Sequence, residues 1–293
     1  MPIFPRVFSI FAKRPRLIKI KVVIAGTPKS GTTALFYMVK RSMPALPKTY
    51  FEPKTYDPLA EPKSSSLLVK YIFARGPTDP LNLDDAFNHF DKKIFISRDL
   101  RDSSISGLLY AAAYHLLFDK SEPEISDFLE LLERKEANPQ GTAWTSIWAR
   151  AFGYKYKSPL EALVKDVNYR SRRSIELCRN HQDYFIIKYE DFIDRKLRKL
   201  ENYLGFPLVR NFTVDSVHQR VSRTMNYGDW RHWFTAEDVQ VFKPLVSEYL
   251  EYFQYDKNDW RLAASPRILP EHCSLYVKRV LNERRSEVNG SGD

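Results

Sequence analysis

A glycine-bounded loop near the start of the chain carries the strongest chemical signal in the sequence. Gly26 and Gly31 have the G-x-x-x-x-G spacing of a phosphate-binding loop, and they stand between an apolar β-like run and a helical pattern. Several backbone N–H groups of such a loop can point at a phosphate. A nucleoside triphosphatase has Lys and then Ser or Thr after the second glycine, but this chain has Thr32 and Thr33 there and carries Lys29 inside the loop. A lysine at that place suits a single phosphate and the group leaving it.

Two arginine segments could bind a second phosphate. Arg98 follows a β-like run, and Ser106 lies eight residues later in a helical pattern, so both could reach one anion. Arg223 opens a segment rich in aromatic residues, residues 223–235. The structural alternatives are a local ion pair between Arg98 and Asp102 and a surface stack of Arg223 on an aromatic ring.

The octapeptide of residues 26–33, Gly-Thr-Pro-Lys-Ser-Gly-Thr-Thr, resembles the 5′-phosphosulfate loop of sulfotransferases that use 3′-phosphoadenosine 5′-phosphosulfate (PAPS). The resemblance implies that Lys29 neutralises charge on the bridging oxygen. It also implies that the 5′-phosphate is held by Pro28, Lys29, Ser30, Gly31, Thr32 and Thr33. Arg98 and Ser106 are similar to the 3′-phosphate motif of the same family. If the resemblance to this family is set aside, the alternative is that the loop is only a tight strand-to-helix turn.

Residues 223–235 resemble the Arg-Lys-Gly-x-x-Gly-Asp-Trp-Lys segment that closes over the 3′-phosphate in cytosolic sulfotransferases. Thr224 and Met225 replace the Lys and the Gly, so we expect a weaker phosphate clamp and a harder backbone approach. The family's adenine-stacking Trp is here Ala34. The nucleotide contacts that the resemblance implies outside the first loop are Arg98, Ser106, Tyr189, Arg223, Asn226, Tyr227 and Gly228, with Tyr189 near the adenine.

Sulfuryl transfer needs a base that takes the proton of the acceptor. In cytosolic small-molecule sulfotransferases this base is a His two residues after a Lys on a central strand, and the matching Lys70 is followed by Tyr71 and Ile72. Glycan sulfotransferases often use a Glu beside aromatic residues after the first helix, and Glu52 resembles that residue. We therefore predict Glu52 as the base and Lys70 as its supporting cation. Glu61 repeats the local Glu-Pro-Lys pattern and stays an alternative.

The acceptor is predicted from what the chain lacks. The missing His and the short stretch between Phe212 and Arg223 favour an open cleft and a carbohydrate or other polar acceptor with a hydroxyl or amine. The resemblance implies PAPS as co-substrate, its product 3′-phosphoadenosine 5′-phosphate (PAP), in-line displacement and no metal. The alternatives are a sulfotransferase for lipids or secondary metabolites, a non-catalytic nucleotide- or glycan-binding protein on the same fold, and a P-loop kinase.

The elements that must position these residues follow from hydrophobic periodicity. Short β-branched or apolar runs predict strands at residues 20–25, 67–73, 93–97 and 184–188. Helical spacing predicts helices at residues 32–43, 102–118, 125–135, 143–152, 160–180, 197–204 and 236–253, the last interrupted by Pro244. Residues 44–62 are rich in Pro and are predicted as a loop. Alternating strands and helices predict an α/β fold with a parallel central sheet flanked by helices, whose ligands lie at the carboxyl ends of the strands.

Composition sets the remaining limits. The chain has 293 residues, of which 43% are hydrophobic, so it can bury one sizeable core. Its net charge of +10 favours anionic ligands, while the absence of a nucleic-acid-binding motif argues against nucleic acid. Only two cysteines are present, which favours a reducing, cytoplasmic compartment. We predict a basic arm at residues 1–18 with at most weak membrane contact, a sulfotransferase domain at residues 19–265 and a basic C-terminal helix at residues 266–293. The oligomeric state stays open.

Overall fold

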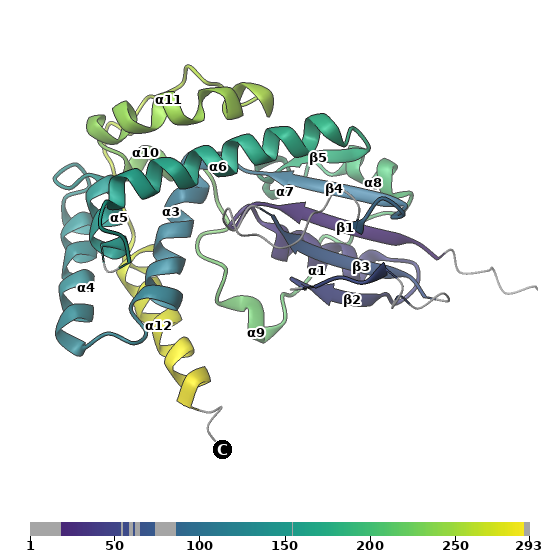
Figure 1. Cartoon of the computed structure of the whole chain (residues 1–293), viewed down its shortest axis with the longest axis horizontal. Coiled ribbons are helices and arrows are strands. Elements are labelled where there is room, and N and C mark those ends of the chain that lie inside the picture. Colours follow the sequence, from purple (N-terminus) through teal and green to yellow (C-terminus); the bar gives the residue numbers. More distant parts are fainter. Residues whose placement is uncertain are drawn as a thin grey trace, which may run out of the picture.

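A computed structural model describes residues 19–53, 55–58, 61, 65–73, 86–153 and 155–289. The predicted basic arm of residues 1–18 therefore lies outside the described residues. The fold is α/β, with a parallel central sheet flanked by helices (Figure 1). No helix in this described part of the chain is long and apolar enough to span a membrane.

The sheet has five strands in the order β2-β3-β1-β4-β5, and every neighbouring pair is parallel. The strands are β1 (Lys21–Gly26), β2 (Lys48–Phe51), β3 (Leu67–Ile72), β4 (Lys92–Ser97) and β5 (Tyr184–Lys188). Strand β1 is central: the chain runs from β1 to the edge strand β2, returns to β3 beside β1, and then crosses to β4 and β5 on the other side. The loop after β1 thus lies where the strand order reverses, which is the usual ligand-binding crevice of an open α/β sheet.

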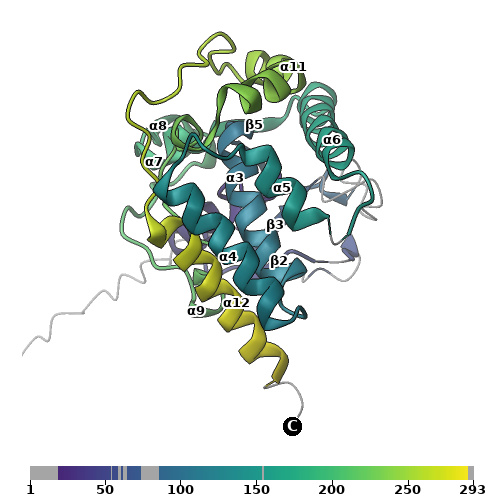
Figure 2. The same ribbon diagram turned by 90° about the vertical axis from the view of Figure 1, so that its left-hand side faces the viewer.

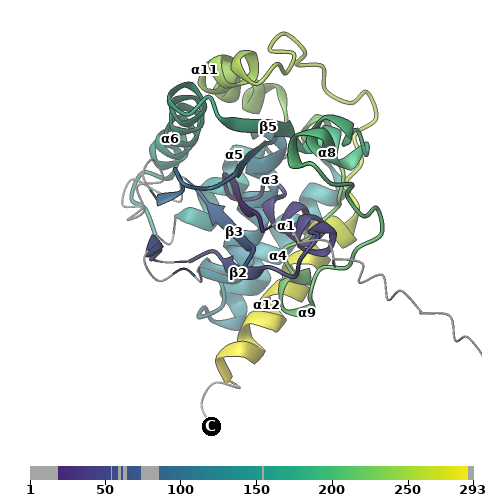
Figure 3. The same cartoon turned by 90° about the vertical axis from the view of Figure 1, so that its right-hand side faces the viewer.

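Helices cover both faces of the sheet. Successive residues of β1 point to opposite faces, so each face presents apolar side chains that the helices bury. Val22 and Ile24 pack with α1 (Thr32–Ser42), α7 (Tyr189–Ile193) and α8 (Arg198–Leu204). Val23 and Ala25 belong to the larger core on the other face. Figure 3 shows α1 and α8 on one side of the strands and α6 on the other.

The larger core is built from most of the remaining helices. They are α3 (Leu100–Ala111) with its π-helical extension η2 (Ala112–Leu116), α4 (Glu122–Ala137), α5 (Trp144–Phe152), α6 (Pro159–Asn180), α10 (Trp230–Trp233), α11 (Ala236–Tyr252) and α12 (Ser274–Asn289). The short elements α9 (Ser216–Gln219) and η3 (Pro270–His272) complete the described chain. Figure 2 shows α12 lying beside α4. The domain boundaries stay predictions, but α12 places Tyr276, Val277, Val280 and Leu281 in this core.

The four predicted strands are present as β1, β3, β4 and β5, and the seven predicted helical stretches match α1, α3 with η2, α4, α5, α6, α8 and α11. Two predictions are wrong. Residues 48–51 form strand β2 instead of a loop, because this stretch is free of Pro and pairs with β3 at the edge of the sheet. Pro244 does not interrupt α11, which runs from Ala236 to Tyr252 with the proline inside it.

Candidate functional site

The loop after β1 has a glycine-like backbone at two positions. Lys29 has φ 65° and Gly31 has φ 98°, both in the left-handed region. Ser30 N–H donates to the carbonyl of Thr27 at 3.2 Å and closes the turn. A hypothetical Cβ on Gly31 would lie 2.5 Å from the Tyr189 ring, so both backbone conformation and space require glycine here. The loop is therefore shaped by residues that the sequence singled out.

The start of α1 is open to an anion. Gly31 is its N-cap and supplies no side-chain hydrogen bond, and the first turn holds no acidic residue. The first N–H groups of a helix have no partner within the helix and carry partial positive charge. Ser30 Oγ is fully buried beside them and has no hydrogen-bond partner in the structure. Such a loop can donate several hydrogen bonds to one phosphate.

The Lys29 side chain reaches from the loop to Val221 and to Tyr110 on α3. Its Nζ donates to the carbonyl of Val221 at 2.7 Å and lies 4.3 Å from the centroid of the Tyr110 ring. Burial lowers the pKa of Lys29 well below its usual value. The positive charges of Arg98 and Arg223 lower this pKa further. An anion bound in the loop would oppose both effects, because a negative charge nearby favours the charged form of Lys29.

Arg98 lies directly after β4 and holds the site together. Its guanidinium donates to the carbonyl of Lys29 at 3.0 Å and to the carbonyl of Asn226 at 3.1 Å. The same guanidinium lies 4.2 Å from the centroid of the Tyr189 ring, and its buried Nε has no partner in the structure. The residue is 6% exposed. Arg98 thus joins the first loop to the distant 223–235 segment. The alternative, a local ion pair between Arg98 and Asp102, is not found among the ion pairs of the described residues.

Arg223 and the residues after it come to the same place. Arg223 pairs with Asp229 at 2.5 Å and donates to the carbonyl of His272 at 3.1 Å. Its buried Nε has no partner in the structure. Met225, which stands where the family has a Gly, has φ 50° and is 69% exposed. The glycine-type conformation is therefore kept by a residue that adopts it at a cost in free energy.

Asp102 fixes the 223–235 segment, a role that the sequence did not indicate. Its carboxylate accepts the N–H of Gly228 at 2.6 Å and the N–H of Trp230 at 3.0 Å. Burial, with Asp99 nearby, raises the pKa of Asp102 to about 7. The first turn of α3 is thereby bound to a segment more than 120 residues away.

Glu52 and Lys70 form an ion pair near the carboxyl ends of β2 and β3, and their roles as base and supporting cation stay predictions. The Lys70 side chain is 1% exposed and the Glu52 side chain 31% exposed. Glu52 has φ 50°, and its N–H donates to the carbonyl of Lys70 at 2.9 Å. Glu61, the alternative, bonds to Lys21 at 2.6 Å at the amino end of β1, so it lies at the opposite edge of the sheet.

The other predicted residues divide into two groups. Thr32 begins α1 and is buried with Ser30, while Pro28 and Thr33 are partly buried in the same turn. Ser106 is 3% exposed on α3, and Tyr189 is buried beneath Gly31 and Arg98. The side chain of Tyr227 leaves the site, because its hydroxyl donates to Asp194 at 2.9 Å. The nucleotide contacts predicted for all these residues stay predictions.

Sequence reasoning missed His218. The ring of His218 stacks on Phe51, with centroids 3.8 Å apart, and its Nδ1 lies 2.7 Å from the hydroxyl of Tyr37. The sequence gives no motif that marks His218 as a site residue. It lies between Phe212 and Arg223, and no fixed spacing links it to Lys70 or Glu52.

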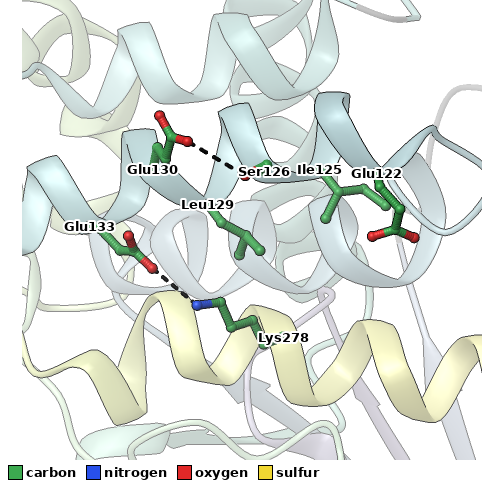
Figure 4. Close-up of a pocket in the computed structure, with 7 residues that line it drawn as sticks. All are labelled: Glu122, Ile125, Ser126, Leu129, Glu130, Glu133 and Lys278. Carbon is green, nitrogen blue, oxygen red and sulfur yellow. Dashed lines mark hydrogen bonds and ion pairs between the residues drawn. The ribbon is translucent and has the colours of Figure 1, made fainter.

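A concave surface lies away from the carboxyl edge of the sheet. Figure 4 shows a groove between α4 and α12, lined by Glu122, Ile125, Ser126, Leu129, Glu130, Glu133 and Lys278. Three glutamates make it unsuited to a phosphate, and none of the predicted site residues lines it. Within the described ranges, no group of three or more His, Cys, Asp or Glu residues could hold a metal ion.

Comparison with known proteins gives weak structural similarities, among them two to sulfotransferases. No family model matches the sequence, and no curated protein matches it. The crystal structure of mouse sulfotransferase SULT7A1 complexed with PAP is 16% identical with a TM-score of 0.47, over 78% of this chain and 84% of that one. A sulfotransferase from Alicyclobacillus acidocaldarius is 14% identical with a TM-score of 0.36, over 82% of this chain and 98% of that one. Similarities of this size do not assign an activity to the chain.

Proposed function

We propose that the protein is a sulfotransferase that moves the sulfuryl group of PAPS to a hydroxyl or amine of a polar acceptor. The proposal rests chiefly on one observation, the convergence of three cations on an uncapped helix start. Arg98 and Arg223 act electrostatically on Lys29 there, beside Ser30 Oγ, which has no hydrogen-bond partner. Clustered cations with unused donors fit a ligand that carries two phosphates and a sulfate.

The chain's own residues would act by holding charge and position. Sulfuryl transfer is an in-line displacement, so the protein mainly orients the reactants and stabilises the charge that develops. Ser30 and the N–H groups at the start of α1 would hold the 5′-phosphate, and Lys29 would stabilise the oxygen that leaves with it. Arg98 and Arg223 would hold the 3′-phosphate. The Glu52–Lys70 pair lies near enough to Lys29 to act on it electrostatically, which supports a proton acceptor at this corner of the site.

The acceptor is proposed from the groups around Lys29. Tyr110 lies under its Nζ, and the Glu52–Lys70 pair adds two opposite charges. Tyr114 stacks on Tyr110 with centroids 5.2 Å apart and accepts from Arg220 at 3.2 Å. Aromatic faces next to charged hydrogen-bonding groups suit a sugar or similar polyhydroxylated compound better than a flat apolar ring. A carbohydrate is therefore the first acceptor class to test, and the cytoplasmic location stays a prediction.

The test is transfer of label from ³⁵S-PAPS to a panel of sugars, phenols and hydroxylated lipids. We expect transfer to polar hydroxylated acceptors and a loss of about 100-fold or more in Lys29→Ala, because one charge at the transition state is removed. Lys199→Ala, which removes an exposed lysine of α8, is the matched control. Tight PAP binding without transfer to any acceptor would instead support a non-catalytic binding protein on this fold.

A further inference from the structure

His218 lies in a segment that crosses the carboxyl edge of the sheet and brings a histidine to the acceptor side. The α9 turn that carries it lies below the sheet edge, near α1 and β2, in Figure 1. The His218 ring covers one face of Phe51, the residue before Glu52, at an interplanar angle of 21°. Three residues later, the carbonyl of Val221 accepts from Lys29 Nζ. His218 thus lies beside the predicted base, in the same segment that contacts the lysine of the phosphate loop.

The hydroxyl of Tyr37 engages one nitrogen of the His218 ring, Nδ1, across 2.7 Å. Either group can donate in this contact, depending on the tautomer of the ring. Burial and the Asp215 carboxylate raise the pKa of Tyr37 to about 12. The negative charge near Tyr37 favours the arrangement in which the Tyr37 oxygen accepts from Nδ1–H of His218. This arrangement leaves the lone pair of the neutral ring on Nε2.

We propose, building on the sulfotransferase function above, that His218 is the base of the reaction and that Tyr37 and Asp215 position it. The acceptor O–H would give its proton to Nε2 while its oxygen forms the new bond to sulfur. The bond from sulfur to the bridging phosphate oxygen breaks, and its electron pair leaves with PAP. The resulting imidazolium is stabilised through Nδ1–H, Tyr37 and Asp215, which is the logic of a base oriented by a third group.

The charges around His218 favour a neutral ring. Burial lowers the pKa of His218 from the ordinary value of a histidine, and the positive charges of Lys70 and Arg220 lower this pKa further. Glu52 and Asp215 act in the opposite direction without reversing the shift. The ring is therefore neutral at neutral pH, and one of its nitrogens carries a lone pair that can take a proton. Glu52, by comparison, is engaged by the Lys70 ammonium, so its carboxylate is better placed to hold Lys70 than to take a proton.

The first experiment is ¹⁵N NMR of the six histidine rings of the whole chain, with the His218 signals assigned from the His218→Gln variant. We expect the neutral ring to carry its proton on Nδ1 and to titrate below pH 6.5. Tyr37→Phe should remove that tautomer preference. A neutral His218 protonated on Nε2, or one that titrates above pH 6.5, would overturn the proposal whatever the enzyme's acceptor is.

The second experiment is the pH dependence of transfer from ³⁵S-PAPS to the best acceptor of the panel. His218→Gln should lower turnover by about 100-fold or more and remove the fall in rate on the acid side. Glu52→Gln should keep that acid limb, and Tyr37→Phe should shift it with a smaller loss of rate. His89→Gln is the control, because His89 bonds to Glu61 at the other edge of the sheet. Unchanged turnover and pH profile in His218→Gln would overturn the proposal.

PAP binding separates this proposal from the function on which it rests. His218→Gln and Tyr37→Phe should bind PAP as the unaltered protein does, since the hydrogen bonds and ring contacts of these two side chains involve each other, Phe36, Lys40, Phe51 and Asp215 rather than residues 26–33. Failure of the unaltered chain to bind PAP would reject the sulfotransferase function. Normal PAP binding together with an unaffected His218→Gln rate would reject only the role of His218.

Discussion

At the scale of single residues, the site depends on a tightly packed group formed by Gly31, Tyr189 and Arg98. Gly31 combines φ 98° with a Tyr189 ring that would lie 2.5 Å from an added Cβ. A methyl group would therefore strain the backbone and displace either the ring or the loop. Tyr189 in turn supports the guanidinium of Arg98 at 4.2 Å.

Gly31→Ala should lower the free energy of unfolding by about 1–3 kcal/mol and weaken PAP binding, because strain and the displaced ring both disturb the phosphate loop. Urea unfolding and calorimetry measure the two effects. Gly205→Ala is the matched control, since Gly205 also has a positive φ, 82°, but no atom lies within 4 Å of its added Cβ. We expect Gly205→Ala to cost stability without changing PAP affinity. Equal PAP affinity in all three proteins would contradict this account of Gly31.

At the scale of elements, Asp102 couples the start of α3 to the segment before α10. Its folded pKa of about 7 lies above the usual 3.8 of Asp, so the folded state binds more protons than the unfolded state between these values. Stability must then fall as pH rises from about 4 to 7, and the cost is complete above pH 7.

Asp102→Asn should reduce this fall in stability, because the amide does not titrate. It should also weaken PAP binding, because an amide NH₂ cannot accept the N–H of Gly228 or Trp230. Urea unfolding at pH 4.5 and pH 8 measures the first effect, with Asp183→Asn as a control whose side chain is 57% exposed. The same pH dependence in Asp102→Asn and the unaltered chain would contradict the burial argument.

The elements could largely be predicted from the sequence because periodicity and Gly or Pro placement are local signals. The edge strand β2 was missed since prolines on both sides hid a four-residue stretch that only its pairing with β3 makes a strand. The site was predictable where a residue sits in a motif, as Lys29 and Arg98 do. His218 and Asp102 were not, because their partners Tyr37 and Gly228 lie 181 and 126 residues away.

At the scale of the whole molecule, the C-terminal helix α12 both completes the core and restrains the segment of residues 220–222. Arg279 donates to the carbonyl of Ser222 at 3.1 Å, and Glu287 pairs with Arg220 at 2.9 Å. These contacts hold the stretch whose residue Val221 accepts from Lys29. Contacts from α12 thus help to fix Lys29.

Leu281→Ala should lower the free energy of unfolding by about 2–5 kcal/mol, because Leu281 is 3% exposed in the main core. Leu275→Ala makes the same chemical change on the exposed side of α12, where Leu275 is 46% exposed, and should stay within about 0.5 kcal/mol. Urea unfolding of both variants tests whether α12 belongs to the core. Equal effects would contradict that placement.

The central claim is that the cation cluster around the first loop binds the sulfonucleotide, and calorimetric titration with PAP, beside ATP with magnesium, tests it most directly. We expect micromolar binding of PAP alone, weakened about 10- to 100-fold in Arg98→Ala through the loss of charged hydrogen bonds. Arg261→Ala, which removes a side chain that is 88% exposed, should bind PAP normally. Absence of PAP binding, or preference for ATP with magnesium, would contradict the sulfotransferase assignment and return the loop to the general nucleoside triphosphatase class.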